Sequence, residues 1–422
     1  MHSSYFHRID GRLFAESIDI RGFVKEAIPT PFYLYSRAQI LRNITLYQQA
    51  LKRAGFAHTL CFAMKANYNP HILSFMAKQG LGVVVVNACE FKQAKNAGFN
   101  AGDMVMHGNG KTRHDLTQAI THHVLLSVDS LFDLTRIHEI ATALGCQAQI
   151  LLRVNPHIDP QVHPYIATAL DESKFGIAEN DLGQALDLLA HMPRITLRGI
   201  HCHIGSAIDS LAPFLQAQDK ALMICNALKN KGFKIDTLDF GGGLGIAYAP
   251  KDPMILADTL IDALAPGFKQ ANLHVIFEPG RSLIGNAGVI ISRVIGVKKQ
   301  QHKNFMVIDA SMCQLLRPPL YQAFHRIEPV VQMHDARTSV YDIVGPICES
   351  SDVLGQNRDM PVLNEHDLVV IWDTGAYGMS MASRYNLQLF KAEYWVEEDR
   401  VFCIRKEEQD LPDLFCHVAY SA

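Results

Sequence analysis

The sequence has little excess charge and lacks any long apolar run. Its 422 residues include 39 basic and 42 acidic ones, so its net charge of -3 gives no electrostatic reason to bind nucleic acid or an anionic membrane. The longest apolar candidate, GLGVVVV, has the length of a strand, whereas a membrane span needs roughly 20 residues. The nine cysteines show no paired spacing, and the first residues lack the pattern of a secretion leader. We therefore expect a cytoplasmic protein with neither a membrane nor a nucleic acid as partner.

Short apolar runs alternate with helix-like segments between about residue 30 and residue 290. The strand-like runs are TLCFAMK, GVVVV, DMVMH, VLLSVD, QILLRVN, TLRGIHCHIG, TLDFGG and HVIFEPG. Strands that alternate with helices indicate a parallel sheet, and about eight such units in about 260 residues match a closed (β/α)8 barrel. An open, doubly wound sheet is the alternative.

The pattern changes beyond residue 290, where strand-like runs follow one another with few helical segments between them. These runs are GVIISRVIGVKK, NFMVIDAS, SVYDIVGPI, DLVVIWDTG, KAEYWVEE and RVFCIRK. We therefore predict an α/β protein with two domains. Residues 28–288 form the barrel, and residues 289–422, joined by residues 1–27, form a mostly β domain.

The stretch CFAMKAN places Lys65 at the end of the first predicted barrel strand, directly behind largely apolar residues. Removing water from an ammonium group is costly unless its charge is paired or lost, so this lysine either reaches solvent or takes part in chemistry. Active groups of a barrel lie at the carboxyl ends of its strands. The other candidates at these ends are Arg153, Asn155, His201, His203, Glu278 and Arg281.

A glycine-rich loop, GGGLG at 241–245, follows the seventh predicted strand. Glycine allows backbone amides to approach an anion closely, and phosphate is the anion we expect, although such a loop by itself is often only a turn. Ser206 adds a hydroxyl donor. A lysine, a phosphate cradle and a glutamate at one barrel mouth predict pyridoxal 5'-phosphate bound through Lys65. Glu278 would then keep the pyridine nitrogen protonated, and His203 would stack on the ring.

A metal-dependent hydrolase is an alternative of a different class. His201 and His203 are two residues apart, so within a strand they share one face, and a carbamylated lysine could join them at a metal. No further histidine and aspartate stand out as ligands at later strand ends, where Asp239 is the nearest candidate. The phosphate cofactor accounts for more of the residues.

Two loops of the second domain carry further reactive groups. GPICESSD at 345–352 holds Cys348 and Glu349, and DTGAYGMS at 373–380 holds Tyr377. The stretch RPPLY brings Arg317 and Tyr321 near one another. Arginines such as Arg281 and Arg317 suit a substrate with carboxylates, because a guanidinium pairs with a carboxylate through two hydrogen bonds; plain solvation at the surface is the alternative.

Over nearly its whole length the chain resembles the diaminopimelate decarboxylases, within the pyridoxal-phosphate enzymes that include the barrel-type ornithine and arginine decarboxylases. The matching stretches are FAMKAN, MHGNGKT, RVNP, HPYIATALDESKFGI, GIHCHIGS, DFGGGLGI, EPGRSLIGNAG, RPPLYQAFHRIEP, VGPICESSDVL and GAYGMSMASRYN. The resemblance implies decarboxylation of meso-diaminopimelate to L-lysine and carbon dioxide, a step of lysine biosynthesis. It also implies a homodimer in which the loop with Cys348 from one subunit completes the site of the other.

The resemblance assigns roles to individual residues. Lys65 resembles the lysine that holds the cofactor covalently, and Cys348 resembles the proton donor. The cofactor-binding positions are Lys65, His203, Ser206, Gly241, Gly242, Gly243, Glu278, Gly280, Arg281 and Tyr377. The substrate-binding positions are Arg281, Arg317, Tyr321, Glu349 and Tyr377.

One stretch departs from the family. Where the family usually has D-V-V-S-G-G-E, this chain has VVVNACE, so Val84 replaces an aspartate and Asn87 a serine. Because this carboxylate is missing, the chain could instead be a decarboxylase of the same family that acts on another carboxylated amino acid or a siderophore-type intermediate. Arg317, Tyr321 and Glu349 argue for meso-diaminopimelate. Cofactor binding without catalysis is the more distant possibility.

Overall fold

The chain divides into two compact units, residues 40–285 and residues 2–39 together with 286–422. The computed structural model describes residues 4–24, 28–159, 173–249, 251–332 and 337–410. Most of the stretch HPYIATALDESKFGI, which supports the family resemblance, lies outside the described residues. Each unit has its own sheet and is described by itself.

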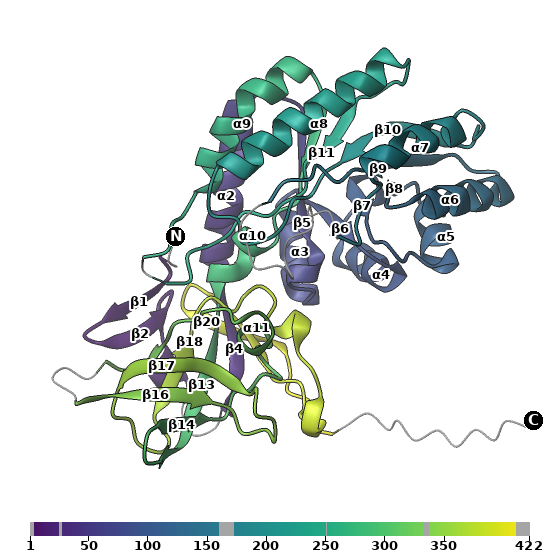
Figure 1. Ribbon diagram of the computed structural model, residues 1–422. Helices are drawn as coiled ribbons and strands as arrows, with labels where there is room; N and C mark the ends of the chain where they lie inside the picture. The colour runs from purple at the N-terminus through teal and green to yellow at the C-terminus, as the bar shows by residue number, and fades with distance from the viewer. Residues whose placement is uncertain (1–3, 25–27, 160–172, 250, 333–336, 411–422) are drawn as a thin grey trace, which may run out of the picture. The chain divides into compact units, whose positions relative to one another are not determined.

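The first unit is a closed barrel of eight strands, as the alternating pattern predicted (Figure 1). Every strand pairs with its neighbours in parallel, and β12 closes the barrel on β5. The open sheet that we kept as an alternative is therefore wrong. The strands are β5 (His58–Ala63), β6 (Gly82–Val85), β7 (Met104–Met106), β8 (Leu125–Val128), β9 (Ala148–Arg153), β10 (Ile195–His201), β11 (Thr237–Asp239) and β12 (His274–Phe277).

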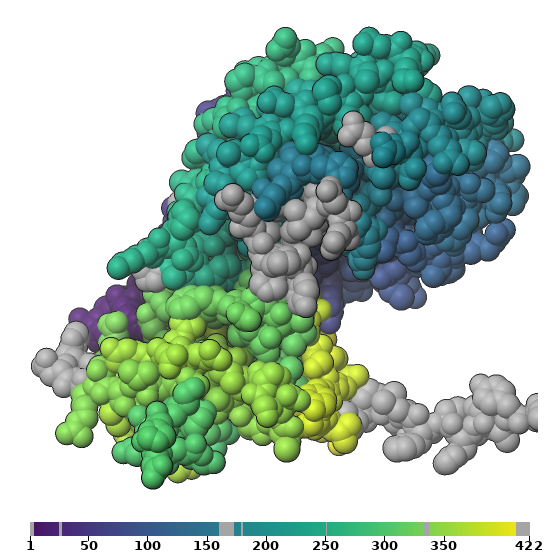
Figure 2. Space-filling model, in the orientation of Figure 1, coloured from purple at the N-terminus to yellow at the C-terminus, as the bar shows by residue number. Residues whose placement is uncertain are grey.

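Helices connect the barrel strands, and α8 and α9 make the outer surface on one side of this unit (Figure 2). The helix α4 shows how the sequence sets the ends of these helices. It begins after Asn87, whose side chain accepts a hydrogen bond from the amide of Glu90 at 2.9 Å, and it ends at Gly98 with φ +101°. The helices are α2 (Arg37–Ala54), α3 (Pro70–Lys78), α4 (Ala88–Ala97), α5 (Arg113–Thr121), α6 (Leu131–Leu144), α7 (Leu182–Leu189), α8 (Ala212–Asn230), α9 (Ala257–Ala271) and the short α10 (Arg281–Ile284).

The middle of the barrel interior is apolar. Cys61, Val84, Val105 and Ile276 form one buried cluster on four strands that are consecutive around the barrel. Val105 and Ile276 lie two residues before His107 and Glu278, so their side chains share the inner face of the barrel with these residues. Because side chains of a strand alternate between its two faces, the next inward positions toward the carboxyl ends belong to the polar residues described below.

The second unit is mostly β. A small sheet consists of β1 (Phe6–Ile9), β2 (Arg12–Ala15) and β3 (Ile18–Asp19). The large sheet has the order β17-β16-β14-β13-β4-β19-β20, with β18 also pairing with β13 and β15 with β18. Its strands are β4 (Phe32–Ser36), β13 (Gly288–Lys299), β14 (Asn304–Ile308), β15 (Ile327–Pro329), β16 (Thr338–Val344), β17 (Val353–Pro361), β18 (Leu368–Ile371), β19 (Glu393–Glu397) and β20 (Arg400–Arg405). Two short helices, α1 (Ile20–Phe23) and α11 (Arg317–Tyr321), complete it.

The first domain boundary lies later than the sequence suggested. We placed the start of the barrel at residue 28 and its end at residue 288, whereas the compact unit covers residues 40–285. The reason is β4, which is buried along its length and pairs with both β13 and β19 of the second unit. The local pattern of FYLYS indicates a strand but does not say which sheet supplies its partners.

Among the described ranges, no helix is both long enough and apolar enough to cross a bilayer.

Candidate active site

Lys65 lies in a 3-10 turn, η1 (Met64–Ala66), directly after β5. Its side chain is exposed, whereas Met64 and Ala66 on either side are buried. The turn packs against Gly280, where an added Cβ would lie 3.1 Å from the Cβ of Ala66. The amide of Ala63 also donates to the carbonyl oxygen of Pro279 at 3.2 Å. The lysine turn is therefore fixed beside the Glu278–Arg281 stretch, as the barrel topology requires.

His203 lies beside the glycine-rich loop and within the electrostatic influence of Lys65. Loss of hydration, followed by the positive charge of Lys65, lowers the pKa of His203 to about 3. The ring is therefore neutral, and its Nδ1 accepts a hydrogen bond from the amide of Gly242 at 3.3 Å. The strand β10 ends at His201, so the alternation of a strand does not extend to His203 and the expected shared face does not follow from it.

The glycine-rich loop has no room for side chains. A Cβ on Gly242 would lie 2.3 Å from the carbonyl oxygen of Glu278, and one on Gly243 would lie 2.6 Å from that of Gly205. Gly241 and Gly243 have φ values of +65° and +118°, which L side chains rarely adopt. Backbone segments after β10, β11 and β12 therefore meet closely here. This is the cradle shape that suits a phosphate group.

Arg281 supplies positive charge and hydrogen-bond donors beside this loop. Although it is buried, its guanidinium donates to Ser206 Oγ at 3.0 Å and to Tyr248 Oη at 2.5 Å. The structure thus brings together Ser206 and Arg281, which the sequence singled out separately. It adds Tyr248, which no motif indicated, because a lone tyrosine after a glycine-rich loop carries no signal of its own.

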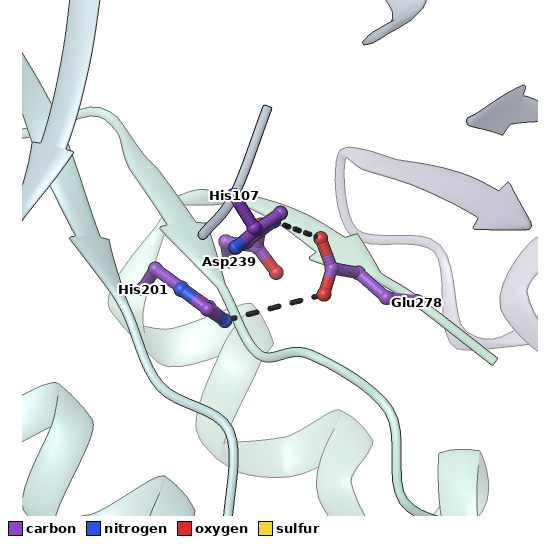
Figure 3. A group of neighbouring side chains, drawn as sticks. All are labelled: His107, His201, Asp239 and Glu278. Carbon is purple, nitrogen blue, oxygen red and sulfur yellow. Dashed lines mark hydrogen bonds and ion pairs between the residues drawn. The ribbon is translucent and has the colours of Figure 1, made fainter. Parts of the chain in front are cut away.

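Four buried side chains meet at the carboxyl ends of β7, β10, β11 and β12 (Figure 3). His107 Nε2 lies 2.6 Å from Glu278 Oε1 and 3.5 Å from Asp239 Oδ2. The His201 ring packs edge-on against that of His107, with centroids 4.1 Å apart, and its Nδ1 shares a hydrogen bond with Ser127 Oγ at 2.9 Å. Asp239 Oδ1 accepts from the amide of Gly241 at 2.9 Å. The four residues thus link the barrel interior to the glycine cradle.

The ion pair between His107 and Glu278 outweighs the effect of burial. Burial lowers the pKa of His107, but the carboxylates of Glu278 and Asp239 raise it to about 9. Burial raises the pKa of Glu278, but the charge of His107 and its hydrogen bond bring it down to about 2. Burial and the charge of Glu278 raise the pKa of Asp239 to about 7. At neutral pH, Glu278 is therefore ionised and His107 is protonated.

The sequence analysis missed His107 and set Asp239 aside. His107 ends the run DMVMH, which we read as a strand, so the rule that active groups follow barrel strands could have found it. The donor atoms of the four residues lie within 4.8 Å of one another, a spacing that a metal ion could also bridge. The pair proposed for a metal hydrolase was His201 with His203, however, and His203 is not in this group.

In the second unit, Cys348 and Glu349 lie on a loop that Asp352 holds. Asp352 is buried and accepts from the amides of Met312 at 2.6 Å and Ile347 at 3.3 Å. Cys348 is exposed at the loop tip, and its amide donates to Asn386 Oδ1 at 2.9 Å. The loop is therefore shaped from its base and presents the thiol outward.

Glu349 is held by neighbours on the same surface. Its carboxylate accepts hydrogen bonds from the amide and hydroxyl of Ser351 at 3.2 and 3.1 Å, and these bonds lower its pKa. Tyr385 Oη donates to it at 3.4 Å. Glu349 is thus an ionised carboxylate, suited to bind an ammonium group.

Arg317, in contrast, is buried at the start of α11. His325 donates through Nδ1 to the carbonyl oxygen of Trp372 at 2.8 Å, so its Nε2 is the acceptor for Arg317 Nη1 at 2.6 Å. Tyr321 ends the same helix, and Tyr377 is partly exposed with φ +59°. A fixed guanidinium of this kind suits a carboxylate of defined position.

Comparisons with known proteins decide the family. Residues 37–285 match the family model described as pyridoxal-dependent decarboxylase, pyridoxal binding domain. The chain belongs to the pyridoxal-dependent decarboxylases. It is 42% identical over 396 residues to a probable chloroplastic diaminopimelate decarboxylase of Oryza sativa subsp. japonica, covering 92% of this chain and 80% of that one. It is 38% identical to the diaminopimelate decarboxylase of Aquifex aeolicus, covering 96% of each.

A solved structure of a diaminopimelate decarboxylase is similar to this protein over almost the whole chain. The diaminopimelate decarboxylase of M. jannaschii in co-complex with L-lysine has a TM-score of 0.91 and 32% identity, and the match covers 96% of each chain. The fold prediction, a barrel with a second, mostly β domain, is confirmed.

The residues present fit the cofactor of a pyridoxal-dependent decarboxylase. The cradle of Gly241, Gly242 and Gly243 would hold a phosphate; a Cβ at any of the three positions would strike a backbone oxygen, so the close approach of backbone here requires glycine. An ionised, buried Glu278 has the charge needed to stabilise a protonated pyridine nitrogen. An accessible amine, Lys65, stands at the same end of the barrel.

The two departures from the family pattern have different structural consequences. Asn87 caps α4 through its side chain, a task that serine performs equally well, so this replacement conserves the local structure. Val84 lies in the apolar cluster with Cys61, Val105 and Ile276, where an aspartate would add a buried charge below His107. In this decarboxylase, strand β6 therefore contributes no carboxylate to the interior.

Proposed function

We propose that the protein is a diaminopimelate decarboxylase, which removes the carboxylate at one amino-bearing carbon of meso-diaminopimelate and releases L-lysine and carbon dioxide. The observation that carries this proposal is the meeting, at one end of the barrel, of a glycine cradle, an ionised Glu278 and the amine of Lys65. The curated relatives named as diaminopimelate decarboxylases support the choice of substrate.

Bound pyridoxal 5'-phosphate supplies an electron sink for the bond to the departing carboxylate. Lys65 would hold the cofactor covalently through its side-chain amine. The glycine cradle at 241–243 and the hydroxyl of Ser206 would bind the phosphate, and Arg281 would orient that hydroxyl. Glu278 would keep the ring nitrogen protonated, and the neutral ring of His203 would stack on the cofactor ring.

Residues of the second unit bind the substrate and return a proton to it. Arg317 pairs with the distal carboxylate, and the ionised Glu349 pairs with the distal ammonium group. Cys348 donates a proton to the carbon that lost its carboxylate. Tyr321 and Tyr377 complete the substrate pocket. The exposed position of Cys348 supports this role, because the thiol must reach a bound substrate.

We further propose a cytoplasmic homodimer in which the loop with Cys348 from one subunit completes the site of the other. The family resemblance supports the shared site. The eight cysteines of the described residues are free thiols, which fits a reducing compartment. Light scattering on the purified protein measures the oligomeric state, and a monomer with full activity would contradict the shared site.

Carbon dioxide release over a panel of meso-diaminopimelate, ornithine, arginine and lysine tests the function. We expect kcat/KM for meso-diaminopimelate to exceed the other values by orders of magnitude. Only this member of the panel offers both a distal carboxylate to Arg317 and a distal ammonium group to Glu349. A preference for another panel member would refute the substrate.

A related substrate is the second candidate, and Val84 is the observation that favours it. Without the usual aspartate the barrel interior carries one negative charge fewer, which would suit another carboxylated amine. Cofactor-loaded protein that is inactive on the whole panel, but active on another carboxylated amino acid, would favour this reading.

A further inference from the structure

His107 is the only residue of the described buried cluster that can balance the charge of its two carboxylates. Its Nε2 is 2.6 Å from Glu278 Oε1 and 3.5 Å from Asp239 Oδ2, and all three side chains are almost fully buried. His201 is neutral, because burial and the charge of His107 lower its pKa well below the usual value. In this cluster, the imidazolium of His107 is therefore the positive partner of Glu278.

Position 84 makes this dependence stronger in this chain. The side chain of Val84 belongs to the apolar cluster one layer below His107, since Val84 pairs with Val105 in the barrel register and His107 follows two residues later. An aspartate there would compete with Glu278 for the imidazolium. With valine, His107 is shared between Glu278 and Asp239 alone, and Asp239 is also tied to the amide of Gly241.

We propose that His107 is a positioning residue for the cofactor: by donating its Nε2 proton to Glu278 Oε1, it keeps Glu278 as a carboxylate, so that the proton shared with the cofactor stays on the ring nitrogen. This inference rests on the proposed function only in assuming that the cofactor binds with its ring nitrogen at Glu278. The inference adds that the ability of the cofactor to accept electrons depends on His107, which acts on the cofactor through Glu278.

The physical reason is the competition of two bases for one proton. A buried carboxylate without a positive partner has a raised pKa, so it would take the proton from the ring nitrogen and leave two neutral groups. The imidazolium makes that transfer unfavourable, because it would then face a neutral acid instead of a carboxylate. His107 thereby decides where the proton lies, although it need not touch the cofactor.

The pKa values of the groups around Glu278 allow the effect of His107 to be distinguished from that of its neighbours by varying the pH. Those that face it or its neighbours are Lys65, Cys61, His107, Arg153, His201, His203 and Asp239. The pKa of the Cys61 thiol is raised well above its usual value by burial, and both His201 and His203 are neutral at pH 7. Burial and the charge of Glu278 raise the pKa of Asp239 to about 7, and the two carboxylates raise that of His107 to about 9, so His107 should lose its proton at the higher pH.

The test is nuclear magnetic resonance of holoenzyme reconstituted with pyridoxal 5'-phosphate labelled with ¹⁵N at the ring nitrogen. The chemical shift of this nitrogen reports its protonation directly, without substrate. In the unmodified protein we expect a protonated nitrogen at pH 7 and a change toward the unprotonated value as the pH rises through about 9. In His107→Asn we expect the signal at pH 7 to lie more than halfway toward the unprotonated value, with no step near pH 9.

Two further variants separate charge from packing. Ser127→Ala removes the hydrogen bond to His201 but leaves the His107–Glu278 pair, so its nitrogen should behave as in the unmodified protein. Asp239→Asn removes one of the two carboxylates that raise the pKa of His107, so the step should remain but move to a lower pH. The titration of the unmodified protein needs no substitution, so the proposal stays testable even if a variant fails to fold.

A nitrogen that remains protonated in folded His107→Asn at pH 7, or an unmodified protein without a step near pH 9, overturns the role of His107. A protein that takes up no cofactor overturns both this inference and the proposed function. If the nitrogen behaves as expected but meso-diaminopimelate yields no carbon dioxide, only the proposed function fails.

Discussion

In the barrel unit, His107, Asp239 and Glu278 are buried and interact with one another, whereas the thiol and carboxylate of the Cys348–Glu349 loop lie at a surface. His107, Glu278 and Asp239 are each less than 10% exposed, while Cys348 is exposed. The difference in burial matches the two roles proposed for these residues. Control of a proton needs a dry, fixed environment, and delivery of a proton to a substrate needs access.

The same contrast appears in the electrostatics. Glu278 has a pKa of about 2 although it is buried, because an imidazolium lies in direct contact with it. Glu349 also has a lowered pKa, but its causes are hydrogen bonds at an exposed site, where water already stabilises the charge. Removing His107 should therefore change protonation in the barrel far more than removing Ser351 changes Glu349.

The largest expected effect comes from the barrel amine. Lys65→Ala should abolish turnover, because no other amine in the proposed site can hold the cofactor covalently. Borohydride treatment followed by mass spectrometry should attach a pyridoxyl group to Lys65 of the unmodified protein and leave the variant unlabelled. Lys92→Ala, which removes an exposed lysine of α4, should retain the label and the activity. A labelled, active Lys65→Ala protein would contradict the assignment.

The exposed thiol should affect turnover but not cofactor binding. Cys348→Ala should keep the yellow cofactor absorbance and lose about 10²- to 10⁴-fold in kcat, the usual contribution of a positioned acid. Cys403→Ala, which removes another exposed thiol of the same unit, is the matched control and should be unchanged. Equal turnover of the two variants would refute the proton-donor role.

Mixed dimers sharpen the comparison between the two regions. If each site takes Lys65 from one subunit and Cys348 from the other, heterodimers of Lys65→Ala and Cys348→Ala chains contain one intact site. We expect them to recover activity that neither variant has alone. Purified heterodimers as inactive as their parents would show that both residues must come from the same chain.

A medium effect is expected at the glycine cradle. Gly242→Ala places a Cβ against the backbone of Glu278, which cannot move away without disturbing the end of β12. We expect a loss of roughly 1–3 kcal/mol in the free energy of unfolding and weaker cofactor binding, measured by urea unfolding and by cofactor titration. Gly183→Ala, where an added Cβ meets open space, is the control and should lose neither.

The smallest effect concerns one of the two departures from the family. Asn87→Ala removes the side-chain cap of α4 and should lower the free energy of unfolding by about 1 kcal/mol, whereas Asn87→Ser should change it by a few tenths at most. Urea unfolding of the two variants in parallel measures this. A serine variant as unstable as the alanine variant would mean that Asn87 has a role beyond capping.

Local patterns were enough to find the barrel and many candidate residues. The eight apolar runs correspond to β5–β12, and the rule that active groups follow barrel strands selected Lys65, His203 and Glu278. The same patterns did not reveal Tyr248 or the His107–Glu278 pair, because these contacts join residues that are far apart in sequence. The roles of the selected residues remain predictions that the experiments above test.

The sequence by itself determined the alternation of strands and helices, the glycines that the cradle requires and the polar residues at or just after the ends of several strands. These features depend on local backbone preferences and on which side chains avoid water. Only the tertiary structure decided that β4 belongs with the second unit and that one imidazole contacts Glu278. Pairing of distant strands and the ionisation of buried groups depend on which neighbours displace water, and the order of residues along a chain does not specify those neighbours.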